Sequence, residues 1–556
     1  MPLSKIFKEY WKSFSFVGLV VAMLFFSASV TPSLLPRPYY VQGVLSALAI
    51  ATGYAVGVGC VWLYQFMGFP IPDARIQSLS KKITTVSVAV IFVFFVRQMA
   101  FWQNSIRLLM EMPTLESAYP YRTAVIAVLG GATLIALARL LILLASLLSR
   151  WLNRVLPRRV SVVISAAVVI FALLFVGNGI VARRLLDAAD AFFLQADRLI
   201  DQGAEQPSTE LAAGSDQSLV PWESIGREGK NFIAGGPTQA QISEFLGRDA
   251  LRPLRVYVGM RSRDTARLRA QLALEELQRI GAFERSVLIV ATPTGTGWLD
   301  PGAVDSVEYL HAGDTAIVST QYSYLPSWIT ILVDPRRSID SAYELFDVVY
   351  NYWKTLPRDQ RPKLYLHGLS LGALGSEVSA DLYTTFEDPI QGALWSGPPF
   401  ASSQWQQITS HRNAQSPPWL PTYRDGRLIR FTAQNNALNL GKPWGPIRNV
   451  YIQHASDPMV FFSPSLVYRK PDWLAEPRGP DVSPQLTWFP IITFLQVAFD
   501  LPMATSIPVG YGHNYAASSY IDAWVAVTRP AEWSPRDSER LKRHLDQRSA
   551  SDGAKQ

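Results

Sequence analysis

Apolar residues are concentrated in the first third of the chain, where they form five long runs. The runs lie near residues 14–35, 41–66, 83–102, 124–148 and 160–182. A helix of about 20 apolar residues crosses the hydrocarbon core of a bilayer. The pattern therefore predicts an α-helical transmembrane bundle of about five spans over residues 1–182.

The first run follows Lys5, Lys8 and Lys12, an arrangement that cleaved signal peptides share. No small-x-small cleavage site followed by a polar mature start is evident, and a second apolar run follows at once. We therefore expect a retained helix.

Basic residues beside the runs predict the orientation, because Lys and Arg are retained on the cytoplasmic side of a membrane. Ten lie at the amino terminus and in the second and fourth connections: Lys5, Lys8, Lys12, Arg75, Lys81, Lys82, Arg150, Arg154, Arg158 and Arg159. Four lie on the opposite side: Arg37, Arg97, Arg107 and Arg122. The prediction is an inner (cytoplasmic) membrane protein with a cytoplasmic amino terminus, whose remaining chain faces the periplasm or the exterior.

Two features complicate this picture. Arg183 and Arg184 follow the fifth run on the predicted outer side, and an interfacial helix over residues 183–200 would accommodate them at the lipid head groups.

Arg139 lies inside the fourth run. An intramembrane charge is a functional hypothesis, but Arg139 is close enough to the inner end of the run for its side chain to reach the interface, which is the interpretation we favour.

The pattern changes after a polar, turn-rich linker, which with the interfacial helix occupies residues 183–250. Short apolar runs then alternate with amphipathic stretches, which predicts a mostly parallel sheet with helices on both faces over residues 251–530. Expected strands lie at 254–258, 287–291, 316–320 and 364–366, and expected helices at 265–280, 339–353 and 520–527. Residues 531–556 are interpreted as a polar C-terminal tail.

Composition narrows the classes of function. The net charge of +7 accompanies no dense basic patch interleaved with aromatic residues after residue 250, so we expect no nucleic-acid partner. Cys60 is the single cysteine and lies in an apolar run, which excludes an intrachain disulfide and a cysteine zinc site. We expect no metal and no cofactor, and the sequence indicates no particular oligomeric state.

The chemistry centres on Gly-x-Ser-x-Gly at residues 368–372, which follows an alternating apolar run and precedes small, helix-compatible residues. A strand, a sharp turn and a helix form a nucleophile elbow, with Ser370 at the apex of the turn. The five-residue pattern is common by chance, and a strand-to-helix turn with a capping serine also fits it.

A serine nucleophile needs a base, and the base needs a third group to hold its tautomer. His513 lies on a Gly-rich loop ahead of the last predicted helix, where a hydrolase base is expected. His454 is the second choice, although a buried core role suits it better. Asp457 ends a predicted strand in Asp-Pro, which places it at a carboxyl edge. The order Ser370, Asp457, His513 is typical of a hydrolase sheet.

The oxyanion of an acyl-transfer reaction needs backbone donors. The N–H of Leu371, directly after the nucleophile, is the first candidate. The loop at 292–298, which contains Gly295, Thr296 and Gly297, is expected to supply the second. The alternatives for this loop are a plain turn or a nucleotide loop, but no Lys-Ser or Lys-Thr pair follows it, so a P-loop is excluded.

Further short motifs carry a family likeness: residues 31–37, 220–223, 292–298, 321–323, 325–328, the elbow, 397–400 and 481–484. With them the chain resembles the bacterial membrane-anchored α/β-hydrolase family, which has a polytopic N-terminal transmembrane domain and a C-terminal α/β-hydrolase catalytic domain. The resemblance covers almost the full chain and implies serine hydrolase or acyltransferase chemistry. Relatives often have an acidic residue where this chain has Leu369, so the pocket is expected to differ from theirs.

The stretch 464–508 between the predicted acid and base is rich in aromatic residues. It fits an acyl-binding cap that touches the membrane, and equally a set of core aromatics. Candidate substrate-binding residues are Trp298, Trp473, Trp488 and Phe489.

The leading hypothesis is a membrane-anchored serine hydrolase, esterase-like or lipase-like, that acts on acyl esters of lipids or envelope components. An acyltransferase that passes the acyl group to a glycan or lipid hydroxyl is the alternative. A transporter or non-catalytic membrane scaffold is a further class, disfavoured by the single embedded charge and by the order of the three candidate residues. Membrane lipids are the expected partners.

Overall fold

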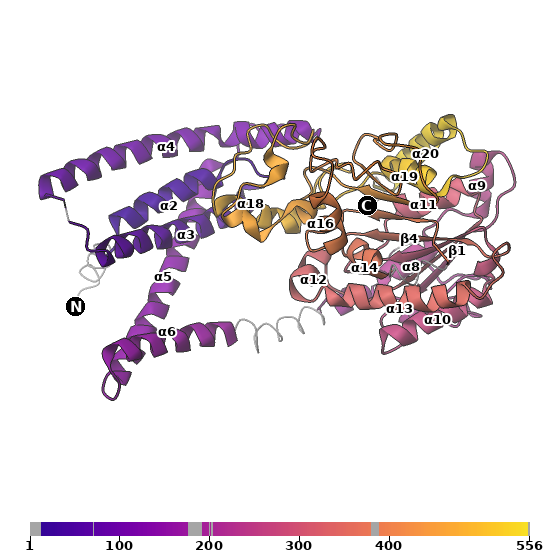
Figure 1. Ribbon diagram of the computed structural model, residues 1–556, viewed down its shortest axis with the longest axis horizontal. Coiled ribbons are helices and arrows are strands. Elements are labelled where there is room, and N and C mark those ends of the chain that lie inside the picture. The colour runs from indigo at the N-terminus through magenta and orange to yellow at the C-terminus, as the bar shows by residue number, and fades with distance from the viewer. Residues whose placement is uncertain are drawn as a thin grey trace. The chain divides into compact units, whose positions relative to one another are not determined.

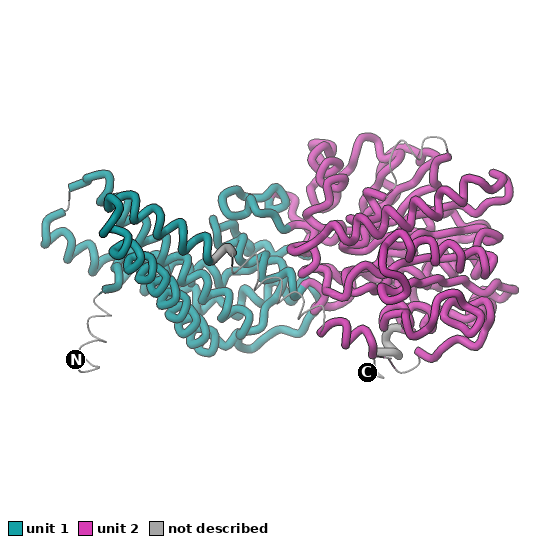
Figure 2. The backbone as a smooth tube through the Cα atoms, turned by 90° about the horizontal axis from the view of Figure 1, so that it is seen from below, with its two compact units in different colours: residues 1–187, 462–474, 480–503 teal, residues 188–461, 475–479, 504–556 magenta. Residues whose placement is uncertain are grey.

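The computed structural model describes residues 13–70, 72–175, 192–199, 201, 204–379 and 388–553. The chain divides into two compact units, coloured separately in Figure 2. Unit 1 comprises residues 1–187, 462–474 and 480–503, and unit 2 comprises residues 188–461, 475–479 and 504–556. The chain therefore passes between the units several times.

Unit 1 is built from apolar helices: α2 (Phe16–Ser29), α3 (Tyr39–Phe66), α4 (Ala74–Leu109), α5 (Pro120–Leu152) and α6 (Arg158–Phe175). Within the described residues, three of them (α3, α4 and α5) are long and apolar enough to cross a membrane. The helix in the first predicted run, α2, has 14 residues, fewer than a full crossing needs. Part of the fifth run, 176–182, and most of the predicted interfacial helix lie outside the described residues. The helical N-terminal region is confirmed, its three long apolar helices suggest membrane association, and the number of five spans stays a prediction.

Arg139 on α5 is held by residues before and beside α2. Its guanidinium donates to the Ser13 hydroxyl (2.9 Å) and to the Tyr54 hydroxyl (2.8 Å), and it lies 3.9 Å from the centre of the Phe14 ring. Ser13 precedes the first turn of α2, so the guanidinium lies at that end of α2, and the snorkelling of Arg139 to the interface stays a prediction.

The C-terminal part of unit 1 comes from the stretch between the predicted acid and base. It contains η4 (Pro464–Val467), η5 (Asp472–Leu474), α18 (Ile492–Asp500) and η6 (Leu501–Met503), and α18 packs against α2 and α3. This differs from the predicted boundary, which assigned the whole stretch to the catalytic domain.

Buried polar contacts explain why this stretch belongs to unit 1. The Asp500 carboxylate accepts from the Ser33 hydroxyl and from the Leu34 N–H (3.1 Å), and its other oxygen lies 3.8 Å from Nε of Arg37. The Gln496 side chain donates to the Thr31 carbonyl (3.0 Å). A buried carboxylate needs such partners, and the connection between α2 and α3 supplies them.

Unit 2 contains a seven-stranded sheet in the order β1-β3-β2-β4-β5-β7-β6, with every neighbouring pair parallel. The strands are β1 (Leu254–Val258), β2 (Val287–Thr292), β3 (Thr315–Thr320), β4 (Lys363–Leu369), β5 (Gly392–Ser396), β6 (Ile429–Thr432) and β7 (Arg448–Ile452). The strands β1, β2, β3 and β5 are buried throughout, as parallel strands covered on both faces must be. The predicted α/β fold is confirmed.

Helices cover both faces of this sheet (Figure 1). One face carries α10 (Ala266–Arg279), α13 (Arg336–Trp353) and α14 (Leu371–Ser379), and the other α11 (Pro301–Leu310), α19 (Ala517–Thr528) and α20 (Pro535–Gly553). The remaining elements are η2 (Trp222–Ser224), α8 (Arg227–Ala234), α9 (Gln239–Leu246), η3 (Ala282–Glu284), α12 (Ser327–Val333), α16 (Ser403–Ser410) and α17 (Pro458–Phe461).

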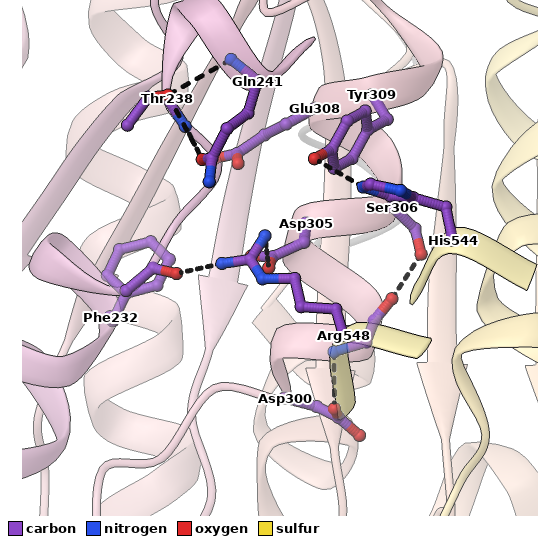
Figure 3. Close-up of polar contacts among 12 residues, drawn as sticks. Phe232, Thr238, Gln241, Asp300, Asp305, Ser306, Glu308, Tyr309, His544 and Arg548 are labelled. Atoms are coloured by element: carbon purple, nitrogen blue, oxygen red, sulfur yellow. Dashed lines mark hydrogen bonds and ion pairs between the residues drawn. The ribbon is translucent and has the colours of Figure 1, made fainter. Parts of the chain in front are cut away.

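The stretch interpreted as a polar tail forms α20, which packs through two leucines four positions apart, Leu541 and Leu545, both buried. Polar contacts add to this packing (Figure 3): Arg548 lies 3.5 Å from Asp305 of α11. Asp305 in turn accepts from Arg255 of β1 at 2.6 Å. The last helix is therefore part of unit 2.

Candidate active site

Ser370 lies in a strained turn between β4 and α14. Its φ of +59° is left-handed, a conformation that costs a non-glycine residue roughly 1–2 kcal/mol. The turn is held because the Ser370 N–H donates to the Ser396 carbonyl at the end of β5 (2.9 Å). Ser370 is 1% exposed, and its hydroxyl has no hydrogen-bond partner among the described residues. This is the geometry of a nucleophile elbow.

The two glycines of the motif are required by close backbone approach. A Cβ at Gly372 would overlap the Thr292 carbonyl at the end of β2, and one at Gly368 would overlap the Gly372 carbonyl. Side chains at either position would push the helix away from the strand that it must leave. The same contacts place the start of the 292–298 loop against the elbow.

Asp457 and His513 form a buried pair. Nδ1 of His513 lies 2.7 Å from an Asp457 oxygen, and a carboxylate only accepts, so Nδ1 carries the proton. Asp457 is fully buried and His513 is 7% exposed. Among the described residues, Nε2 of His513 has no hydrogen-bond partner, so the basic nitrogen is available to a reacting group.

The backbone after β5 links this pair to the elbow. Ser396, which accepts from Ser370, is followed by Gly397 with φ +52°. A Cβ at Gly397 would lie 2.5 Å from Cε1 of His513, so the imidazole ring rests on that glycine. Asp457 and His513 are thus in direct contact. Ser370 is linked to them through Ser396, whose carbonyl accepts its N–H and whose neighbour Gly397 packs against the imidazole ring.

The Asp457 carboxylate is stabilised in its charged form. Burial alone would raise its pKa, but the neighbouring His513 and the hydrogen bonds from His513 and Tyr515 outweigh burial, and the pKa lies below its ordinary value. Asp457 is therefore ionised at neutral pH and fixes the tautomer of His513.

Other histidines have structural surroundings. His454 is fully buried, and its Nδ1 lies 2.9 Å from the Gly512 carbonyl. His367 is buried within β4, where Nδ1 lies 2.9 Å from the Leu394 carbonyl, and burial lowers its pKa to about 4. The Nδ1 atom of each ring thus faces a backbone carbonyl.

The candidate oxyanion donors differ in availability. Leu371 is the first residue of α14, and the first N–H groups of a helix have no partner within it. In the 292–298 loop, the Gly295 N–H donates to the Ser327 hydroxyl and the Gly297 N–H to the Thr294 carbonyl, both at 2.9 Å. These two glycines therefore hold the loop together, and Thr296 is the candidate that remains there.

The four predicted substrate-binding residues are divided between the two units. Trp298 is half-buried in unit 2, where its carbonyl closes the 294–298 turn. Trp473, Trp488 and Phe489 belong to unit 1: Trp473 is 6% exposed, and the Trp488 indole donates to the Leu466 carbonyl at 3.0 Å. Trp473 therefore takes the core role that the sequence left open.

Leu369 ends β4 and is 5% exposed. Sequence reasoning missed Tyr515, whose hydroxyl donates to Asp457 at 2.6 Å. Tyr515 stands two positions after His513, and this closeness in sequence is the signal that could have singled it out.

Comparison with known families matches two parts of the chain. Residues 254–541 match the sequence profile of a family described as the alpha/beta-hydrolase family, and residues 30–237 match that of the alpha/beta-hydrolase family N-terminus. No curated protein and no solved structure matches the chain significantly.

Proposed function

The chain belongs to the α/β-hydrolase family, and on that basis we propose that it is a membrane-anchored serine hydrolase, esterase-like or lipase-like, acting on acyl esters. Ser370 is the nucleophile, His513 the general base and Asp457 the residue that orients it. The observation that carries the proposal is the buried His513–Asp457 pair of 2.7 Å, whose imidazole rests on the glycine next to the carbonyl that anchors Ser370.

The proposed reaction has two halves. Nε2 of His513 takes the Ser370 proton as the oxygen attacks the ester carbonyl, and the negative oxygen that forms is stabilised by the Leu371 N–H together with Thr296. The imidazolium then gives its proton to the departing alcohol, which leaves an acyl group on Ser370. Water then attacks that ester as His513 takes its proton. The imidazolium gives this proton to the departing Ser370 oxygen, which releases the carboxylic acid and free Ser370.

The substrate class is proposed from the membrane half. Three helices long and apolar enough to cross a bilayer would keep the catalytic unit close to acyl esters of lipids or envelope components. We propose an inner-membrane location with the catalytic unit on the outer side, on the charge distribution described above. A reporter fused after residue 200 tests this, and cytoplasmic reporter activity would overturn it.

A fluorophosphonate probe tests the chemistry, because it reacts with serine nucleophiles that a base activates. We expect the full-length wild type to be labelled and Ser370→Ala not to be. Ser410→Ala, which alters an exposed serine at the end of α16, is the matched control and should label fully. Absence of labelling in folded wild-type protein would refute the proposal.

Hydrolysis and acyl transfer share the acyl-enzyme and differ only in the group that attacks it. Product analysis with a labelled ester, with and without an added acceptor alcohol, separates them. Release of free acid in both conditions supports a hydrolase, whereas acylated acceptor as the main product would identify an acyltransferase.

A further inference from the structure

We propose that Tyr515 is a positioning residue for the triad acid, which it orients through a hydrogen bond to the oxygen that also holds His513. The proposal rests on the serine-hydrolase function above and adds a fourth side chain to that site.

The contacts around Asp457 leave little freedom to its carboxylate. One oxygen accepts from Nδ1 of His513 (2.7 Å) and from the Tyr515 hydroxyl (2.6 Å). The other oxygen accepts from the Met459 N–H (2.8 Å). An oxygen of a carboxylate has two lone-pair sites, so Tyr515 and His513 together occupy both sites on the shared oxygen.

Tyr515 is itself held rigidly. It is 4% exposed, and its ring stacks on His454 with the centroids 4.5 Å apart and meets the edge of His513 at 5.8 Å. The His454 backbone N–H also bonds its oxygen. Burial raises the pKa of Tyr515 well above its ordinary value, so the hydroxyl remains a proton donor throughout the working pH range.

The hydrogen bond has an electrostatic consequence for the base. It draws negative charge on Asp457 toward Tyr515 and away from His513, which limits how strongly the carboxylate stabilises the imidazolium. Without the Tyr515 hydroxyl, His513 is the remaining donor to the shared oxygen, which then carries more negative charge. Protonated His513 beside it therefore becomes more stable. The acid limb of the pH–rate profile then moves to higher pH.

Other groups near this cluster do not replace the hydroxyl. Asp457 faces His513, Tyr515 and His454, and Tyr515 faces Tyr520, with ring centroids 6.5 Å apart. The Tyr520 hydroxyl is engaged with the Ser396 hydroxyl at 3.1 Å and with Asp300. Tyr520 is therefore committed to Ser396 and Asp300.

The test uses Tyr515→Phe in the full-length protein with a soluble chromogenic ester. Loss of a hydrogen bond to a charged group predicts a kcat lower by about 10-fold, with KM nearly unchanged. The acid limb of kcat/KM should shift up by about half a pH unit. Tyr350→Phe is the matched control, because Tyr350 is a buried tyrosine whose hydroxyl donates to the Asp388 carbonyl at 2.9 Å; it should change neither quantity.

A second variant keeps the proposal testable if Tyr515→Phe does not fold. Incorporation of 3,5-difluorotyrosine at position 515 makes the hydroxyl a stronger donor, so the acid limb should move to lower pH. Wild-type kinetics in both variants would overturn the role of Tyr515, as would a loss of activity by the same factor at every pH. If the wild type itself fails to react with the fluorophosphonate probe, the proposed function is refuted instead.

Discussion

Replacing Asp500 by asparagine tests how the 480–503 segment is held in unit 1. The carboxylate is fully buried, accepts from Ser33 and from the Leu34 N–H, and faces Arg37 at 3.8 Å. Asparagine keeps an acceptor for the first two groups but removes the charge opposite the guanidinium. The variant therefore isolates the electrostatic part of the anchor.

The magnitude follows from the geometry. Two unit charges 3.8 Å apart attract by about 4 kcal/mol at an effective dielectric constant of about 20. Breaking a buried ion pair by removing one partner costs about 3–5 kcal/mol in general. We expect Asp500→Asn to destabilise unit 1 by about 3 kcal/mol and Asp500→Ala, which also removes the acceptor, by about 5 kcal/mol.

Thermal unfolding of the full-length protein in detergent measures the effect. A loss of about 3 kcal/mol lowers the midpoint by about 6–12 °C in a unit of this size. Asp472→Asn is the matched control, since Asp472 is exposed in η5, in the 462–474 segment of the same unit, and it should melt like the wild type. The double variant Arg37→Gln with Asp500→Asn should lose less than the sum of its single changes. If Asp500→Asn melts with the wild type, the anchor contributes nothing and the reasoning fails.

Two further predictions concern unit 2. Gly397→Ala places a methyl group 2.5 Å from Cε1 of His513 and should lower kcat/KM for the chromogenic ester by about 100-fold; wild-type activity in folded Gly397→Ala would contradict the stated position of the base. Burial of Glu377 raises its pKa to about 8, so folding favours the protonated acid. Its contribution to the free energy of unfolding is complete below about pH 4.5 and falls by about 1.4 kcal/mol per pH unit up to pH 8. Glu377→Gln should abolish that decline in unfolding midpoints measured from pH 6 to 8, and an unchanged decline would show that another group causes it.

The candidate site in unit 2 was predictable because its signals are local. The strand before Ser370, the glycines at 368 and 372 and the Asp-Pro at 457–458 each depend on residues close in sequence. A serine after one strand and an aspartate after another then meet at the carboxyl edge of a parallel sheet without further information.

The parts that differ depend on distant partners. Gln496 and Asp500 have no local pattern that names Thr31 or Ser33 as their partners more than 460 positions earlier. The α20 helix is polar apart from the few positions that it buries, so its composition suggests a tail. The hydrogen bonds that the Gly295 and Gly297 N–H groups donate within their loop depend on the backbone conformation. A Gly-rich sequence allows many conformations, so these bonds could not be predicted from it.

The division of the chain has a consequence for biosynthesis. The last long apolar helix of unit 1, α5, ends 340 residues before α18 begins. The polar groups of the α2–α3 connection find their partners only when α18 has been made. His513 follows later still. Maturation of the membrane half therefore waits for nearly complete translation, and a chain that stops between residues 462 and 503 leaves both halves unfinished.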